Sequence, residues 1–214
     1  SGLTPIADAY EGWLTSQKQQ VQGLPAWLQE PAEEALVEAG QALAQLREGI
    51  EFLAGHAEAH RCFAFMNSVM ADQRVHSQVA ELRKASESLS LAAATEAVEQ
   101  RPGSHQWRTF QLAFVLMQLK ALWDPTSERR SSPDLAKVQL LFFPTGGGKT
   151  EAYLGLAAYT FAVRRRQGVI TTDDGPIDGR SGVAVLMRYT LRLLTSQQFQ
   201  RAATLVCASE LERR

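Results

Sequence analysis

A glycine-rich segment carries the clearest chemistry in the sequence. Three consecutive glycines are followed by a lysine and a threonine, directly after an apolar run at residues 138–143. Glycines let backbone N–H groups approach phosphate oxygens that a Cβ atom would crowd. A lysine supplies a full charge for the β- and γ-phosphates, and a threonine hydroxyl can bind Mg²⁺. The segment therefore predicts a nucleoside triphosphate site, formed by Thr145, Gly146, Gly147, Gly148, Lys149, Thr150 and Glu151. The alternative is a glycine-rich strand-to-helix turn with a solvated lysine.

The details of this loop favour one class of phosphate-binding protein. The strict P-loop pattern requires glycine at position 143, where this chain has Phe143. Pro144 and Thr145 ahead of Gly-Gly-Gly-Lys-Thr instead resemble motif I of superfamily 2 helicases and translocases. In that resemblance Lys149 and Thr150 are the catalytic pair, and the cofactors are ATP and Mg²⁺.

A second apolar segment, residues 185–198, resembles motif Ia of the same superfamily. Such a segment presents hydroxyls, N–H groups and an arginine to the phosphates of one nucleic-acid strand, without reading its sequence. Tyr189 stands where proline is usual. The resemblance implies nucleic-acid contacts from Thr190, Arg192 and Gln197. The alternative is a core strand followed by a solvated basic helix.

Residues 107–111, with sequence WRTFQ, resemble the Arg-x-aromatic-Gln signature with which many of these helicases recognise adenine. A glutamine amide both donates and accepts hydrogen bonds, which matches the adenine edge. Arg108 and Gln111 are therefore candidates for base binding, and a structural helix start is the alternative.

Taken together, residues 107–114, 140–155 and 185–203 resemble the large helicase subunit of the bacterial DISARM anti-phage system, and so does the stretch 63–73. The resemblance implies a longer, ATP-dependent DNA helicase or translocase that acts on a single strand, or on a duplex with a single-stranded end, together with a companion subunit. No acidic Walker B box follows Arg192, so we expect residues 1–214 alone to bind ATP without hydrolysing it.

Other residues carry weaker signals. His56 and His60 have the i, i+4 spacing of helical metal ligands and Cys62 lies nearby, but no acidic partner completes a site, so we expect packing or surface roles. We interpret the basic run 164–166 as a helix end favoured by the helix dipole, with nucleic-acid contact as the alternative. The chain has two cysteines far apart in the sequence, so we expect no disulfide framework and a cytoplasmic location. Its apolar runs are shorter than a membrane-spanning helix requires, so we expect no membrane span.

The chain has 214 residues, of which 45% are hydrophobic, and a net charge of −1. This composition supports a folded core rather than a disordered tail. Residues 1–100 carry 6 Lys or Arg and 14 Asp or Glu, whereas residues 101–214 carry 16 and 9. The C-terminal half is therefore the part in which a polyanion is expected to bind.

The elements that must position these residues follow from periodicity. Apolar residues recur every three or four positions from 33 to 53, which predicts an amphipathic helix with Pro31 in its first turn and a stop at Gly55. Further helices are predicted at 7–19, 57–73, 79–98, 107–123, 149–166 and from 191 to about 207. Buried parallel strands are predicted at 138–143 and 183–187, with a loop at 167–182.

These elements predict an α plus α/β protein. Residues 1–103 would form a helical N-terminal domain, and residues 104–214 the first part of a RecA-like P-loop NTPase domain with a parallel sheet. Two other functions remain open: a regulatory nucleotide-binding switch, and a helical assembly domain with a vestigial motor fragment. Neither would move nucleic acid.

Overall fold

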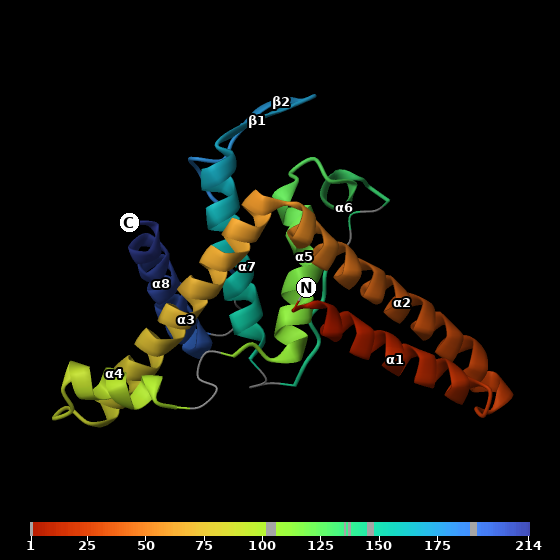
Figure 1. Ribbon diagram of the computed structural model, residues 1–214, viewed down its shortest axis with the longest axis horizontal. Coiled ribbons are helices and arrows are strands. Elements are labelled where there is room, and N and C mark those ends of the chain that lie inside the picture. The colour runs from red at the N-terminus through yellow and green to blue at the C-terminus, as the bar shows by residue number, and fades with distance from the viewer. Residues whose placement is uncertain (1, 102–105, 135, 137, 145–147, 189–191) are drawn as a thin grey trace. The chain divides into compact units, whose positions relative to one another are not determined.

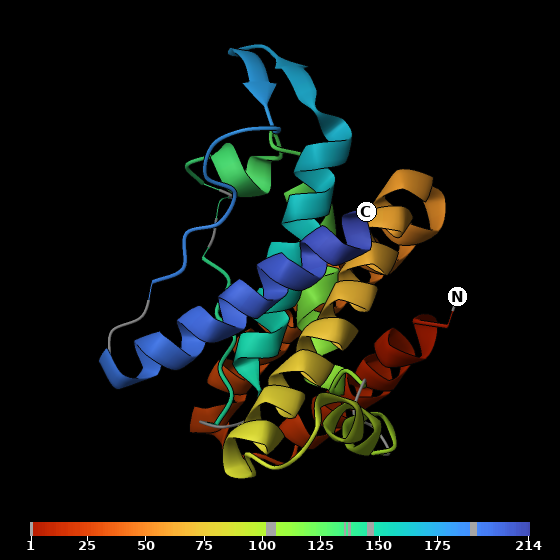
Figure 2. The ribbon, with the colours of Figure 1, turned by 90° about the vertical axis from the view of Figure 1, so that its left-hand side faces the viewer.

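The structure is a computed structural model of residues 1–214, and it describes residues 2–101, 106–134, 136, 138–144, 148–188 and 192–214 (Figures 1 and 2). The chain divides into two compact units. The first unit comprises residues 1–60 and 109–141, and the second comprises residues 61–108 and 142–214. The predicted domain boundary after residue 103 falls within residues 102–105, outside the described part of the chain.

The first unit is a helical assembly of α1 (Thr4–Val21), α2 (Ala26–Gly55), α5 (Thr109–Trp123) and the short α6 (Glu128–Ser131). Helix α2 packs against both α1 and α5. Its buried residues Leu43, Leu46, Ile50 and Leu53 recur every three or four positions, so the predicted amphipathic face is confirmed. The predicted start is wrong, because α2 begins at Ala26 and contains Pro31 in its interior.

Gly49 allows α2 and α5 to come unusually close. A Cβ atom at this position would collide with the carbonyl oxygen of Leu116, which lies at the buried face of α5. Next to Gly49, the carboxylate oxygens of Glu48 form ion pairs with Nζ of Lys120 and Nη2 of Arg129, each at 2.6 Å. The first unit therefore depends on a backbone approach that only glycine permits.

We predict that Gly49→Ala destabilises the first unit by about 1–3 kcal/mol, because the added methyl forces the two helix backbones apart. Gly40→Ala is the matched control in the same helix, since a Cβ there meets nothing within 4 Å. The control should stabilise by about 0.5–1 kcal/mol, because alanine replaces glycine within a helix. Urea unfolding of both variants tests this, and equal effects would refute the close approach.

The second unit contains α3 (Ala57–Ala85, from Arg61 onward), α4 (Leu91–Glu99), α7 (Lys149–Gln167), α8 (Arg192–Arg213) and the strands β1 (Val169–Thr172) and β2 (Gly175–Asp178). Helix α3 is continuous where a break after residue 73 was predicted, and the chain breaks instead between α3 and α4. The core of the second unit includes the fully buried residues Cys62, Met66, Val69, Ala158, Tyr159, Val163 and Leu205.

Tyr159 is the largest of these buried side chains. Burial raises the pKa of its hydroxyl, which has no hydrogen-bond partner among the described residues. Such an unsatisfied hydroxyl costs about 1–3 kcal/mol, and burial of the aromatic ring offsets this cost. The centre of α7 is thus held by packing and not by polar contacts.

The predicted parallel sheet and RecA-like fold are wrong. Residues 138–143 and 183–187, both predicted to be strands, form no strand and pair with none. Val138, Leu140 and Phe142 are 96%, 80% and 89% exposed. The sheet in the described residues is an antiparallel pair of β1 and β2 within the segment that was predicted to be a loop. A two-residue turn at Asp173 and Asp174 closes this pair locally, whereas parallel pairing needs a long crossover and a partner strand.

Candidate functional site

The glycine-rich loop leads into the N-terminus of α7. Thr145, Gly146 and Gly147 lie outside the described residues. Gly148 is the N-cap residue of α7 and has φ = +90°, a left-handed conformation that favours glycine. As a glycine, this N-cap residue has no side chain that could cap the helix. The prediction that a helix begins at Lys149 is confirmed, and its first N–H groups are the kind that bind anions.

Lys149 folds back over the residues that precede the glycines. Its ammonium group donates hydrogen bonds to the carbonyl oxygens of Phe143 and Pro144, the latter at 3.2 Å. Both partners are neutral, so the lysine charge is not balanced by a carboxylate within these contacts. The arrangement holds a cation against the two residues that precede Thr145 in the sequence, and the phosphate-binding role of Lys149 stays a prediction.

The next two residues of α7 differ in their surroundings. Thr150 is half-buried in the first turn. Glu151 forms an ion pair with Arg201 of α8, with 2.5 Å between the carboxylate oxygen Oε1 and Nη2. In this structure the carboxylate of Glu151 joins two helices, and its nucleotide-binding role stays a prediction.

Gly155 sets the packing of α7 one turn further on. A Cβ atom at Gly155 would lie 2.8 Å from Cη2 of Trp107, and 3.5 Å from Sδ of Met66. The indole N–H of Trp107 donates to the side-chain oxygen of Asn67 at 2.7 Å. Trp107 therefore links α3 to α7, a packing role that the sequence did not reveal.

The two adenine candidates lie in different units. Arg108 is exposed and ends one segment of the second unit, whereas Gln111 belongs to α5 of the first unit and is only 4% exposed. The phosphate-loop residues belong to the second unit. The adenine role of Arg108 and Gln111 stays a prediction.

The three candidates for nucleic-acid binding lie at or near the start of α8. Thr190 is outside the described residues, and α8 begins at Arg192, whose side chain is likewise not described. Gln197 is exposed on this helix, and the aromatic ring of Phe199 close by is exposed as well. An exposed amide and an exposed ring are suited to nucleic-acid contact, but no feature here tests that role.

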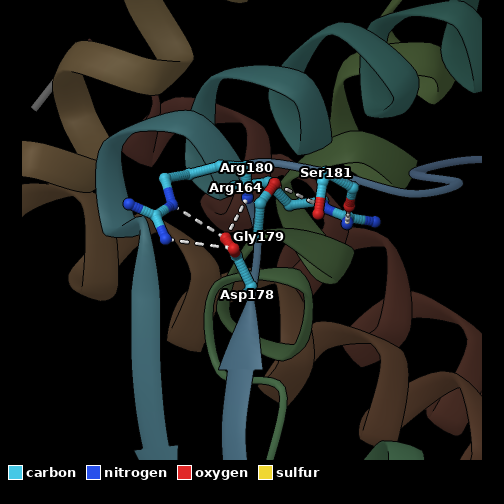
Figure 3. Close-up of polar contacts among 5 residues, drawn as sticks. All are labelled: Arg164, Asp178, Gly179, Arg180 and Ser181. Carbon is cyan, nitrogen blue, oxygen red and sulfur yellow. Dashed lines mark hydrogen bonds and ion pairs between the residues drawn. The ribbon is translucent and has the colours of Figure 1, made fainter.

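Arg164, near the C-terminal end of α7, binds the segment that follows the β hairpin (Figure 3). Its guanidinium donates to the carbonyl oxygens of Gly179 at 3.1 Å, Ser181 at 2.6 Å and Val183 at 2.6 Å. The Gly179 N–H donates to the carbonyl oxygen of Gly168 at 2.7 Å, and a Cβ atom at Gly179 would stand 2.7 Å from the carbonyl oxygen of Arg164. Arg164 thus holds one end of the segment that leads toward residues 185–198.

Beside this contact, hydrogen bonds from Arg180 lower the pKa of Asp178 to about 2 (Figure 3). For the run 164–166 the sequence suggested a helix-dipole role, with nucleic-acid contact as the alternative, but not the binding of carbonyl groups. The signal in the sequence that could have indicated this contact is a glycine-rich segment, residues 168–182, directly after a helix that ends in three arginines. Backbone carbonyl groups in such a segment can accept hydrogen bonds from an arginine.

We predict that Arg164→Lys keeps the charge but loses the planar fork, which binds several carbonyls at once. Losing these charged hydrogen bonds should destabilise the 179–183 segment by about 1–3 kcal/mol. Hydrogen exchange followed by mass spectrometry would then show faster exchange there. Arg165→Lys, at an exposed neighbouring position, is the control and should leave exchange unchanged. Identical exchange in both variants would contradict the prediction.

His56, a possible metal ligand from its spacing, has other partners. Its ring packs against Trp123 with 4.3 Å between centroids and 60° between the ring planes, and its Nδ1 accepts the Ala59 N–H at 3.2 Å. Cys62 is fully buried, and Cys207 is exposed. Within the described ranges, no three His, Cys, Asp or Glu side chains come together in a way that could hold a metal ion. Among the same residues, no helix has the length and apolarity to cross a bilayer.

Comparisons with known proteins give one informative match. No protein-family model matches the chain. The chain is 37% identical over 213 residues, 99% of its length, to a Bacillus paralicheniformis protein named DISARM protein DrmA. It spans only 17% of the length of that relative. The predicted resemblance to a DISARM protein is thereby confirmed, and the chain is similar over nearly its whole length to one part of a much longer protein of that system.

Proposed function

We propose that this chain is the ATP-binding part of a DNA helicase or translocase that acts in DISARM-type defence against phage. The observation that carries the proposal is the Lys149 ammonium, which lies at the N-terminus of α7 and donates to the neutral carbonyl oxygens of Phe143 and Pro144. The similarity to DISARM protein DrmA supports the defence role. The proposal requires only the loop and α7, and no parallel sheet.

The site suits a triphosphate for electrostatic reasons. Lys149 now donates to two neutral carbonyl oxygens. Hydrogen bonds between an ammonium group and a phosphate oxygen are charge-assisted and about twice as strong as neutral ones. An arriving phosphate would therefore displace the carbonyls of Phe143 and Pro144, while the N–H groups at the start of α7 bind the same anion. Gly148 has no Cβ atom that would crowd the phosphate oxygens.

The remaining roles in this proposal follow from the residue types. Thr150 would bind Mg²⁺, which neutralises charge that develops on the phosphates. Arg108 and Gln111 would select adenine. Thr190, Arg192 and Gln197 would bind the backbone of a DNA strand, helped by the basic excess of residues 101–214. A companion DISARM subunit would act with the whole protein in the cytoplasm, where its DNA substrate lies.

Lys149→Ala tests the phosphate site. We expect Mg-ATP to bind about 10- to 100-fold more weakly, because the variant loses charged hydrogen bonds worth about 1.5–3 kcal/mol. Isothermal titration of the purified protein measures the affinity. Lys84→Ala, which removes an exposed lysine of α3, is the control and should bind normally. The phosphate-site proposal fails if the unaltered protein releases no heat with Mg-ATP.

The DNA role is tested separately from ATP binding. We expect single-stranded DNA to stimulate ATP hydrolysis by the whole protein, and Arg192→Ala to reduce the slope of log affinity against log salt by about 1. Lys18→Ala, in helix α1, is the control and should keep the slope. Hydrolysis that is indifferent to DNA and RNA would remove the translocase role.

A second candidate function is a nucleotide-dependent assembly module that moves no DNA. The observation that favours it is the exposed apolar segment directly before the phosphate loop, which includes Val138, Leu140 and Phe142. Exposed apolar side chains in such a row are typical of protein contact sites. ATP binding without DNA stimulation, combined with ATP-dependent association with a partner protein, would favour this function.

A further inference from the structure

The ion pair between Glu151 and Arg201 joins helix α7, whose start is proposed to bind nucleotide, to helix α8, which is proposed to bind nucleic acid. Glu151 lies in the first turn of α7, directly after Lys149 and Thr150. Arg201 lies on α8, one turn after Gln197. The carboxylate and the guanidinium approach to 2.5 Å. Helix α8 is thus tied to the first turn of α7, which contains Lys149 and Thr150.

This pair is well shielded from solvent. The Arg201 and Glu151 side chains are 28% and 21% exposed. In the ion pairs of Arg47, Lys120, Arg129, Arg180, Arg213 and Arg214, by contrast, at least one side chain is 40% exposed or more. Coulomb interactions weaken with solvent screening, so this pair holds its helices more firmly than a surface pair would.

The pair is also incompletely satisfied. The second carboxylate oxygen of Glu151, Oε2, is buried and has no hydrogen-bond partner among the described residues. A buried carboxylate with a single partner is sensitive to any new charge nearby. A triphosphate bound at Lys149 would repel Glu151 and attract Arg201, so its arrival acts directly on the link between the two helices.

Resting on the proposed function, we propose that the Glu151–Arg201 pair couples nucleotide binding at the loop to nucleic-acid binding by α8. Arg201 is a positioning residue in this scheme: its contact with Glu151 sets where α8 presents Gln197. Two sites coupled in this way influence each other's affinity reciprocally. Binding of nucleotide at the loop would thereby change the nucleic-acid affinity of α8 through a single contact between side chains.

The test measures coupling rather than affinity. Anisotropy of a fluorescein-labelled single-stranded oligonucleotide gives the Kd of the purified protein with and without Mg-AMPPNP. We expect the nucleotide to change this Kd by about fivefold or more in the unaltered protein. Glu151→Gln and Arg201→Gln should each reduce the ratio to below about twofold, and the double variant should lose no more, because both remove the same interaction.

Controls separate coupling from folding and from lost charge. Arg201→Lys keeps the positive charge and should retain part of the ratio. Arg213→Gln removes a more exposed arginine of the same helix and should keep the full ratio. Thermal unfolding of each variant confirms that it is folded.

The outcomes distinguish the two proposals. If Mg-AMPPNP binds and the unaltered protein shows no change in Kd, the coupling is refuted and the phosphate site stands. If the variants keep the full ratio, the ion pair is structural only and the inference is overturned. If no nucleotide binds, the proposed function fails and the coupling fails with it.

Discussion

The close packing of α7 is the constraint on which the second unit depends. Ala152, Ala157 and Ala158 are buried along this helix, and Gly155 lies against Trp107. Small residues let the neighbouring side chains reach the helix backbone, and interiors packed in this way move little. Because a helix is a stiff rod, fixing its middle also fixes its ends. Lys149 stands at one end and Arg164 near the other, so the same buried face positions both cations.

The polar contacts around α7 differ in how readily an incoming anion could compete for them. Lys149 donates to two carbonyls, and its ammonium group can turn toward a phosphate. Arg164 donates to three carbonyls through a planar group, which holds a loop more rigidly. Glu151 and Arg201 form a charged link between α7 and α8. In the proposed scheme the contacts of Lys149 and of Glu151 with Arg201 would respond to a charged ligand at the loop, whereas Arg164 keeps the segment 179–183 in place.

Helices were predictable from the sequence because their signals are local. The spacing of Leu43, Leu46, Ile50 and Leu53 predicted the buried face of α2, and the glycines predicted the start of α7. The apolar runs at 138–143 and 183–187 could not be interpreted in the same way. Such a run becomes a strand only when another backbone pairs with it, and here none does among the described residues. The hairpin was missed for the opposite reason. Its pairing is closed by a short turn in a segment rich in glycine and aspartate, which looked like a loop.

The sequence alone determined which chemical groups enter the glycine loop, and that Lys149 begins a helix, because residue types, a left-handed glycine and helical periodicity act over a few neighbouring positions. Only the tertiary structure decided that Glu151 pairs with Arg201, that Arg164 holds residues 179–183, and that Trp107 packs on Gly155. These contacts join residues that lie well apart along the chain. Their formation depends on how helices pack and which backbone groups remain unpaired, and no local pattern encodes either.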